Sequence, residues 1–149
     1  MDFSSEQLFQ FFAQTGSLIR FEPGTIFGNT NAHIGVVVNS DPNTQRAVVV
    51  VCATSQLDKA RSFAVRRNLH PGTVVSISGG THAHFGQNTA FLCNTPESVS
   101  YDVLASWHGE GNIRLIRRNN QIDTTLLNEI RAGIIASDMV EDTIKDMLV

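Results

Sequence analysis

Three things are scarce or missing in this sequence of 149 residues: long apolar runs, cysteine, and a large excess of charge of either sign. No apolar stretch approaches the ~20 residues that a membrane-spanning helix needs. The first residues, Met1-Asp-Phe-Ser-Ser-Glu6, lack the basic start and the apolar stretch of a signal peptide. We therefore expect a cytosolic protein that makes no contact with a membrane.

Only two cysteines are present, Cys52 and Cys93, and both fall in apolar, strand-like segments. A buried thiol behaves as a small hydrophobic group, which is our interpretation of both. The absence of a Cys-x-x-Cys motif and of a third cysteine argues against a thiolate zinc site. The sequence also lacks Gly-x-Gly-x-x-Gly, Gly-Lys-Ser/Thr and Gly-x-Ser-x-Gly, which argues against nucleotide hydrolases and α/β-hydrolases.

The remaining composition is that of a globular protein, with 42% hydrophobic residues, 17% charged residues and a net charge of −3. A chain of this length has the size of one domain and buries roughly two-thirds of its unfolded surface. No repeat, low-complexity tract or linker interrupts it. We therefore expect a single domain over residues 1–149.

The central feature of the sequence is a β-hairpin predicted over residues 31–55. Two runs rich in β-branched residues, 31–39 and 46–55, flank a segment of turn formers at 40–45. Polar residues occur at both outer ends of this hairpin: Asn31 and His33 at the start, Thr54 and Ser55 at the finish. In an antiparallel pair these ends lie side by side, so we expect a polar rim of the sheet there.

Helices are predicted at the two ends of the chain. Ser4 opens a capping box, and Gly16 ends the helix that follows. Apolar residues recur at helical spacing after Asp123 or Thr124, either of which caps this second helix. Ser137 is expected to cap a final helix.

Between the helices the sequence predicts short strands separated by turns. They are residues 25–27, the two hairpin strands, 73–78, 89–93, 99–107 and 113–116. Residues 56–73 are expected to form an arginine-bearing loop. Strands followed by helices indicate an α+β fold that suits a small β-barrel. The expected arrangement is an N-terminal helix within 1–20, a barrel over 21–118 and C-terminal helices over 122–149.

Basic residues gather in the middle of the chain, where residues 46–118 hold eight arginines and lysines against four acids. Four of the eight, Lys59, Arg61, Arg66 and Arg67, lie in the connection after the hairpin. Such a cluster is either a plain solvated surface or a site that neutralises phosphates of a polyanion.

Three histidines, His33, His82 and His84, are candidates for proton transfer. Metal-free RNA cleavage needs a base for the 2′-hydroxyl, an acid for the leaving 5′-oxygen and donors for the phosphate. Imidazole serves as base or acid because its pKa lies near neutrality. The His82-Ala-His84 spacing also places two imidazoles on one face of a strand, as in metal sites of cupin-like barrels, although Gln87 stands near the expected glutamate.

Several short segments resemble the MazF/PemK-like toxin family, over roughly residues 21–105. Pro23-Gly24 stands where the family has its opening glycine turn, and Val36–Val38 matches its second strand. Val49–Ser55 matches the family's strand that closes in Thr-Ser, and Gly80–Cys93 is similar to a stretch in divergent members.

This resemblance implies an SH3-like barrel that forms a homodimer, cleaves single-stranded RNA without a metal or other cofactor, and is blocked by an antitoxin protein. It also implies a catalytic or phosphate-contacting role for Thr54. Where the family usually carries an arginine before the second strand, this chain has His33.

The leading hypothesis is thus a toxin-like, metal-independent endoribonuclease. Its predicted catalytic residues are His33, Thr54, Ser55, His82 and His84, and its predicted substrate-binding residues are Asn31, Lys59, Arg61, Arg66 and Arg67. The first alternative is a non-catalytic barrel module that binds a nucleic acid or a protein partner. The second is a metal-dependent enzyme that uses the two histidines of the His82-Ala-His84 segment.

Overall fold

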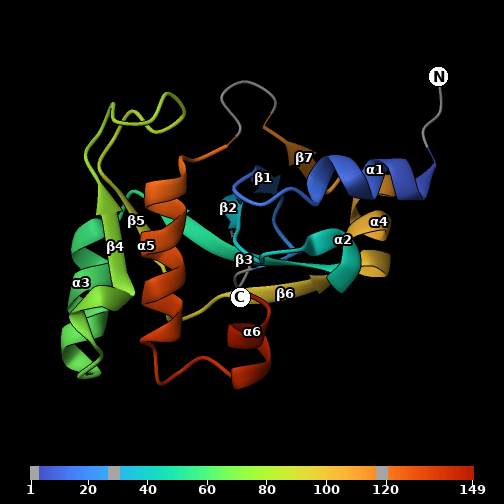
Figure 1. Cartoon of the computed structure of the whole chain (residues 1–149). Helices are drawn as coiled ribbons and strands as arrows, with labels where there is room; N and C mark the ends of the chain where they lie inside the picture. The colour runs from blue at the N-terminus through green and yellow to red at the C-terminus, as the bar shows by residue number, and fades with distance from the viewer. Residues whose placement is uncertain (1–3, 27–30, 117–120) are drawn as a thin grey trace.

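The computed structural model describes residues 4–26, 31–116 and 121–149 and has an antiparallel sheet with helices on both faces (Figure 1). This confirms the predicted α+β class. The strands are β1 (Leu18–Phe21), β2 (His33–Val37), β3 (Ala47–Thr54), β4 (Val74–Ile77), β5 (Thr89–Leu92), β6 (Glu97–Ser100) and β7 (Ile113–Leu115). The helices are α1 (Ser5–Phe12), α2 (Pro42–Gln45), α3 (Leu57–Arg66), the short 3-10 turn η1 (Pro71–Thr73), α4 (Tyr101–Gly109), α5 (Thr124–Ile135) and α6 (Asp142–Asp146). None of the described helices is long and apolar enough to cross a membrane.

The sheet is built around β3. Its strand order is β4-β5-β3-β2-β1-β7, and β6 also pairs with β3. Two strands share one edge of β3, because Ala47–Val50 pairs with β6 whereas Ala53 and Thr54 pair with β5. The predicted hairpin is confirmed as β2 and β3, with Ile34 opposite Ala53 and Val37 opposite Val50.

The expected SH3-like barrel does not close. Among the described residues β4 and β7 lie at opposite ends of the sheet, and no ladder joins them. Helix α5 lies over one face and fills it with apolar side chains that join the core of that face: Leu126, Leu127, Ile130 and Ile134. The face that a closed barrel would line with strand residues is therefore covered by a helix.

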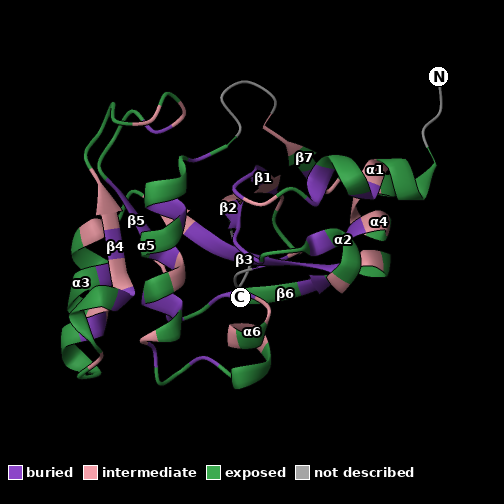
Figure 2. Cartoon of the chain, viewed as in Figure 1, coloured by how far each residue is buried: buried purple, intermediate pink, exposed green. Residues whose placement is uncertain are grey.

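The valines of β3 are buried on both faces of the sheet (Figure 2). Val49 and Val51 join the core beneath α5, whereas Val48 and Val50 join the core beneath α1 and α4. Side chains alternate along a strand, and a strand covered on both sides is apolar throughout rather than at every second position. The unbroken valine run is explained by this burial.

The N-terminal helix was predicted correctly at its start but not at its end. Ser4 and Gln7 form the expected capping box, with Ser4 Oγ accepting from the Gln7 N–H at 3.2 Å. The helix ends at Phe12 rather than at Gly16, and the sheet begins already at Leu18. The strand predicted at 25–27 is wrong at residues 25 and 26, where the chain makes a bend. Residue 27 lies outside the described residues.

Two further predictions of local structure were wrong. The segment 56–73 is not a loop, because it contains the helix α3. In the sequence the apolar residues of this helix are interspersed with basic residues. The strand predicted at 99–107 ends after Ser100, whose hydroxyl accepts from the Val103 N–H and caps α4. The six residues predicted as a turn at 40–45 include the single helical turn α2, which ends at Arg46 with a φ of 55°.

At the C-terminal end, Asp123 caps α5 as predicted, its carboxylate accepting from the Leu126 N–H at 2.8 Å. The final helix begins after Glu141, so Ser137 is not its cap. The Ser137 hydroxyl is buried and donates instead to Asn94 Oδ1 at 2.6 Å.

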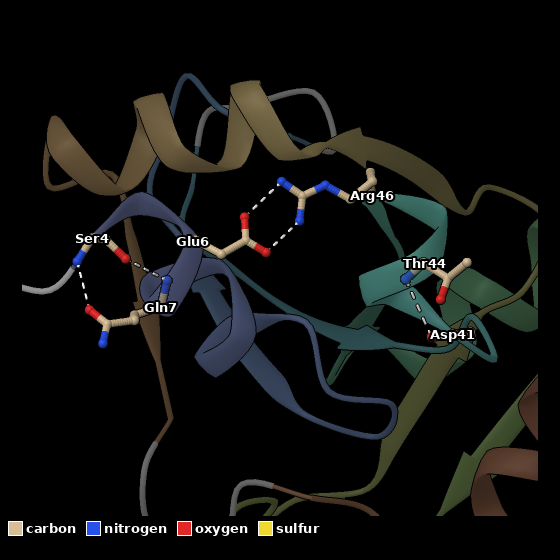
Figure 3. Close-up of polar contacts among 6 residues, drawn as sticks. All are labelled: Ser4, Glu6, Gln7, Asp41, Thr44 and Arg46. Carbon is tan, nitrogen blue, oxygen red and sulfur yellow. Dashed lines mark hydrogen bonds and ion pairs between the residues drawn. The ribbon is translucent and has the colours of Figure 1, made fainter.

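Arg46 forms an ion pair with Glu6 of α1 (Figure 3). Its guanidinium donates to both carboxylate oxygens of Glu6, at 2.8 and 3.0 Å. The same group lies 4.0 Å from the centroid of the Tyr101 ring and 5.0 Å from that of Phe9. One side chain thus joins α1, the end of α2 and α4 on the face opposite α5.

Candidate ribonucleotide-binding site

Thr54 and Ser55 lie where β3 ends and the chain turns into α3. Thr54 Oγ1 accepts a hydrogen bond of 3.1 Å from the N–H of Gln56, so this hydroxyl helps to shape the turn. A hydroxyl that accepts in this way keeps its own proton available for donation. Ser55 is exposed beside it.

A cavity of about 280 Å³ opens next to Thr54, between α3 and the sheet. Thr54 pairs with Ala90, and Leu92 pairs with Val74, so alternation puts Thr54, Leu92 and Val74 on the same face of the sheet. Helix α3 covers this face with one apolar side. The lining residues are Thr54, Gln56, Lys59, Ala60, Phe63, Thr73, Val74, Leu92, Asn94 and Thr95.

A second, shallower hollow of about 380 Å³ adjoins the cavity through Gln56 and Lys59. It contains Ser55, and Asn88 of the β4–β5 connection forms its far side. The structure therefore brings three predicted residues, Thr54, Ser55 and Lys59, to two neighbouring hollows at one rim of the sheet.

The four predicted cations lie on or directly after α3, and all are exposed: Lys59, Arg61, Arg66 and Arg67. The ion pairs found within the described residues are Arg20–Glu22 and Arg46–Glu6, so none of the four has a carboxylate partner there. Arg66 donates to the Ser62 carbonyl at 3.3 Å, and the Arg67 guanidinium lies 5.1 Å from the Phe63 ring centroid. The helix thus presents a positive surface, defined here as the α3 surface, beside the cavity.

His33 adjoins Thr54 in the hairpin. The β2–β3 register pairs Ile34 with Ala53, so the next positions along the two strands are His33 and Thr54. Both lie on the face that also carries Cys52, because Cys52 is two residues from Thr54. The His33 Nδ1 atom lies 3.7 Å from Cys52 Sγ, and Asn31 is exposed just before the strand.

Cys52 is held as a neutral thiol. Burial, with a smaller contribution from the charge of Glu97, raises the pKa of Cys52 to about 11. Burial likewise raises the pKa of Cys93 to about 12. Nucleophilic attack needs a thiolate, so neither cysteine is suited to attack a substrate near neutral pH.

The other two predicted histidines lie on the α5 side of the sheet. His82 lines a separate hollow of about 350 Å³ together with Asp123, Leu126 and Glu129. His82 Nε2 donates to the Gln121 carbonyl at 3.1 Å, and its Nδ1 accepts from the His84 N–H at 3.0 Å. Both nitrogens of this ring are therefore used to hold the β4–β5 turn.

His84 packs edge-on against Phe85, with ring centroids 5.1 Å apart. Burial, and to a smaller extent the neighbouring His82, lowers the pKa of His84. The structure does not bring either histidine of this turn into the cavity beside Thr54, and their predicted catalytic roles remain untested. In the part of the chain that is described, no group of three or more His, Cys, Asp or Glu residues is placed to hold a metal ion.

The sequence reasoning missed Gln56, Phe63 and Asn94 as members of this site. Phe63 carried a usable signal, because Ala60, Phe63 and Ala64 recur at helical spacing within the segment that was predicted as a loop. Asn94 carried none, since its place in the cavity depends on a contact with Thr73 from a distant turn.

The chain was compared with family models, curated proteins and solved structures, and only the solved structures show a likeness. No protein family model matches it, and no curated protein matches its sequence. Among solved structures it is similar to a chain in the crystal structure of MazE-MazF (Form-III) from Deinococcus radiodurans, with a TM-score of 0.48 and 14% identity. The match covers 81% of this chain and 91% of that chain. The function proposed below therefore rests on the residues of this chain.

Proposed function

We propose that this protein acts on single-stranded RNA, which it binds on the α3 surface and cleaves without a metal ion. The observation that carries the proposal is the set of exposed cations on and after α3 that have no carboxylate partner among the described residues: Lys59, Arg61, Arg66 and Arg67. They lie beside a cavity that holds the Thr54 hydroxyl.

Unpaired cations favour a polyanion because each one that meets a phosphate releases a condensed counterion. A single strand suits this surface better than a duplex, since α3 also presents Phe63 beside the cations and aromatic rings stack on unpaired bases. Asp58 is the one acidic residue within α3, so the surface keeps a clear positive surplus. These features support RNA as the ligand.

The proposed reaction is attack of a ribose 2′-hydroxyl on its own 3′-phosphate. The 2′-oxygen forms a bond to phosphorus while the bond from phosphorus to the 5′-oxygen breaks, which leaves a 2′,3′-cyclic phosphate and a 5′-hydroxyl. His33 takes the 2′-proton as a general base, the leaving 5′-oxygen takes up a proton from solvent water, and the hydroxyls of Thr54 and Ser55 donate to the phosphate. Support comes from the neighbouring positions of His33 and Thr54 on one face of the hairpin.

The sequence resemblance to MazF/PemK-like toxins adds two proposed partners, a second copy of this chain and an antitoxin protein. In this proposal the antitoxin covers the α3 surface, since a protein that blocks the cations also blocks RNA. An acidic segment is the partner chemistry that fits such a surface.

RNA binding is tested by fluorescence anisotropy at 50 to 300 mM salt with a labelled ten-nucleotide 2′-O-methyl RNA, which lacks the 2′-hydroxyl needed for cleavage. Four phosphate contacts predict a slope of log K against log salt of about −3, and neutralising one cation lowers its magnitude by about 0.7. Arg61→Gln is expected to show this change, whereas Arg114→Gln on β7 is the matched control and keeps the wild-type slope. Binding that does not depend on salt contradicts the proposal.

Cleavage is tested by incubating the unmodified RNA of the same sequence in EDTA and separating the products on a gel. The wild type is expected to cut the RNA, and His33→Ala is expected to lose at least 100-fold in rate, as for a general base. RNA that stays intact with the wild type, but is bound with the predicted salt slope, leaves the alternative of a non-catalytic binding module.

A further inference from the structure

We infer that the cavity beside Thr54 receives one base of the bound RNA and prefers a base with a carbonyl group, uracil or guanine, over cytosine or adenine. This inference rests on the proposed binding of RNA to the α3 surface. It adds a base-recognition site and names Lys59 and Gln56 as the residues that determine specificity.

The walls of the cavity suit the faces of a flat ring. Phe63 and Ala60 from α3 stand opposite Val74 and Leu92 from the sheet. Apolar and aromatic walls of this kind hold an unstacked base by its two faces. The volume of about 280 Å³ lies just below the usual range for sites of drug-sized ligands, so it suits one base and not two.

The polar groups at the buried end of the cavity are already satisfied. Asn94 Nδ2 donates to Thr73 Oγ1 at 2.9 Å, and Asn94 Oδ1 accepts from the Ser137 hydroxyl at 2.6 Å. The Thr73 hydroxyl in turn donates to the His70 carbonyl at 2.7 Å. All three side chains are buried, so this network supports the cavity but does not read the edge of a base.

The polar side chains that remain for a ligand lie at the exposed end of the cavity and belong to Lys59, Gln56 and Thr95. The Lys59 ammonium is exposed and has no carboxylate partner among the described residues, and the Gln56 side-chain amide makes no described hydrogen bond. The one proton of the Thr54 hydroxyl is used for the phosphate in the proposed reaction, so this hydroxyl does not read the base. Lysine can only donate, so it favours an edge that presents carbonyl oxygens, such as O4 of uracil or O6 of guanine.

Cytosine and adenine carry an amino group at the same place. This group cannot accept a hydrogen bond from the lysine ammonium, so these bases lose the contact. An unpaired polar edge in a confined site is the usual source of discrimination between bases of equal size. The Gln56 amide both donates and accepts, so it can pair with the neighbouring ring nitrogen of the preferred base. The two side chains lie three positions apart and both line the cavity.

The test compares two labelled 2′-O-methyl RNAs, an eight-nucleotide run of uridine and one of cytidine, by anisotropy at constant salt, because the methyl groups prevent cleavage. These bases are equal in size and differ at position 4, where uracil has a carbonyl and cytosine an amino group. The wild type is expected to bind the uridine RNA about tenfold more tightly. Lys59→Met removes this preference, whereas Arg61→Met is the matched charge control and weakens both RNAs by the same factor.

Lys59 and Gln56 are exposed, so replacing either side chain is not expected to disturb folding. Gln56→Ala is a second test of the same base preference. Equal affinity of the wild type for the two RNAs overturns the base site while leaving the proposed RNA binding in place. Binding of neither RNA at 50 mM salt overturns both proposals. A preference that survives Lys59→Met and Gln56→Ala also overturns the base site, because another part of the surface then reads the base.

Discussion

The Nδ1 atom of His33 lies 3.7 Å from Sγ of Cys52, at the end of the hairpin where β3 leaves the sheet. This contact holds the imidazole on the face of the sheet that also carries Thr54 and the cavity under α3. It also places a neutral thiol against the proposed base.

The raised pKa of Cys52 predicts a loss of stability at high pH. The folded state keeps the thiol protonated up to about pH 11, whereas the unfolded chain releases the proton near pH 9.0. Between these values the unfolded state binds fewer protons, so the free energy of unfolding falls as pH rises, by up to about 3 kcal/mol. Urea unfolding at pH 8, 9, 10 and 11 measures this slope.

Cys52→Ala provides the comparison for that measurement. It is less stable than the wild type at pH 8 because a buried sulfur is removed, but its stability falls less steeply between pH 9 and pH 11. Other groups titrate in both proteins and cancel in the difference. Parallel curves for the two proteins contradict the assignment of a buried, neutral thiol.

His84 predicts a separate loss of stability on the acidic side. Its pKa is lowered in the folded state by burial and by His82, so the neutral ring is favoured by folding. The stability that this ring contributes is complete above the unfolded pKa of about 6.5 and is lost as pH falls below it. His84→Gln is expected to lose less stability than the wild type between pH 7 and pH 5, as read from urea midpoints. An equal loss in both proteins contradicts this role.

Gly133 is predicted to be required by close packing inside α5. A Cβ atom there would lie 2.7 Å from the Gly72 carbonyl oxygen and 2.9 Å from Cys93 Sγ. Alanine favours a helix by about 1 kcal/mol over glycine, but overpacking costs about 1–3 kcal/mol, so Gly133→Ala should be destabilising.

Gly86→Ala is the matched control for Gly133→Ala, since a Cβ at this position meets open space. Thermal unfolding is expected to show a lower Tm for Gly133→Ala and little change for Gly86→Ala. A Gly133→Ala protein as stable as the wild type contradicts the close approach of α5 to η1 and Cys93.

The cap of α5 predicts a smaller effect. The Asp123 carboxylate accepts from the Leu126 N–H at 2.8 Å, and replacement of such a cap by alanine costs about 1 kcal/mol. Asp123→Asn keeps an accepting oxygen and should retain most of the stability. If alanine and asparagine at this position give the same chemical denaturation midpoint, the hydrogen bond does not stabilise the helix.

Local patterns in the sequence were sufficient for the hairpin and for the caps of α1 and α5. Turn formers between two valine-rich runs and hydroxyl or carboxylate caps act through neighbouring residues, and the structure confirms them. The helix α3 was missed because Lys59, Arg61 and Arg66 are interspersed among its apolar residues, although Phe63 keeps the helical spacing. Barrel closure was expected, but α5 covers the face of the sheet that closure would enclose.

The division of the histidines could not be predicted from the sequence. His33 lies on the α3 side, whereas His82 and His84 belong to a turn that reaches Gln121 on the α5 side. Which face of a sheet a connection approaches depends on contacts between residues far apart in the chain. In this case the deciding contact joins positions 39 residues apart.

The central claim, that RNA lies on the α3 surface and not on the α5 side, is tested most directly by mapping backbone amides. The ¹⁵N-labelled protein is titrated with a ten-nucleotide single-stranded 2′-O-methyl RNA at low salt, and amide chemical shifts are followed by NMR. The shifts are predicted to concentrate in residues 54–67 and 92–95, with α5 amides nearly unchanged. Shifts confined to α5 and the turn at His82, or no shifts at all, would contradict the account.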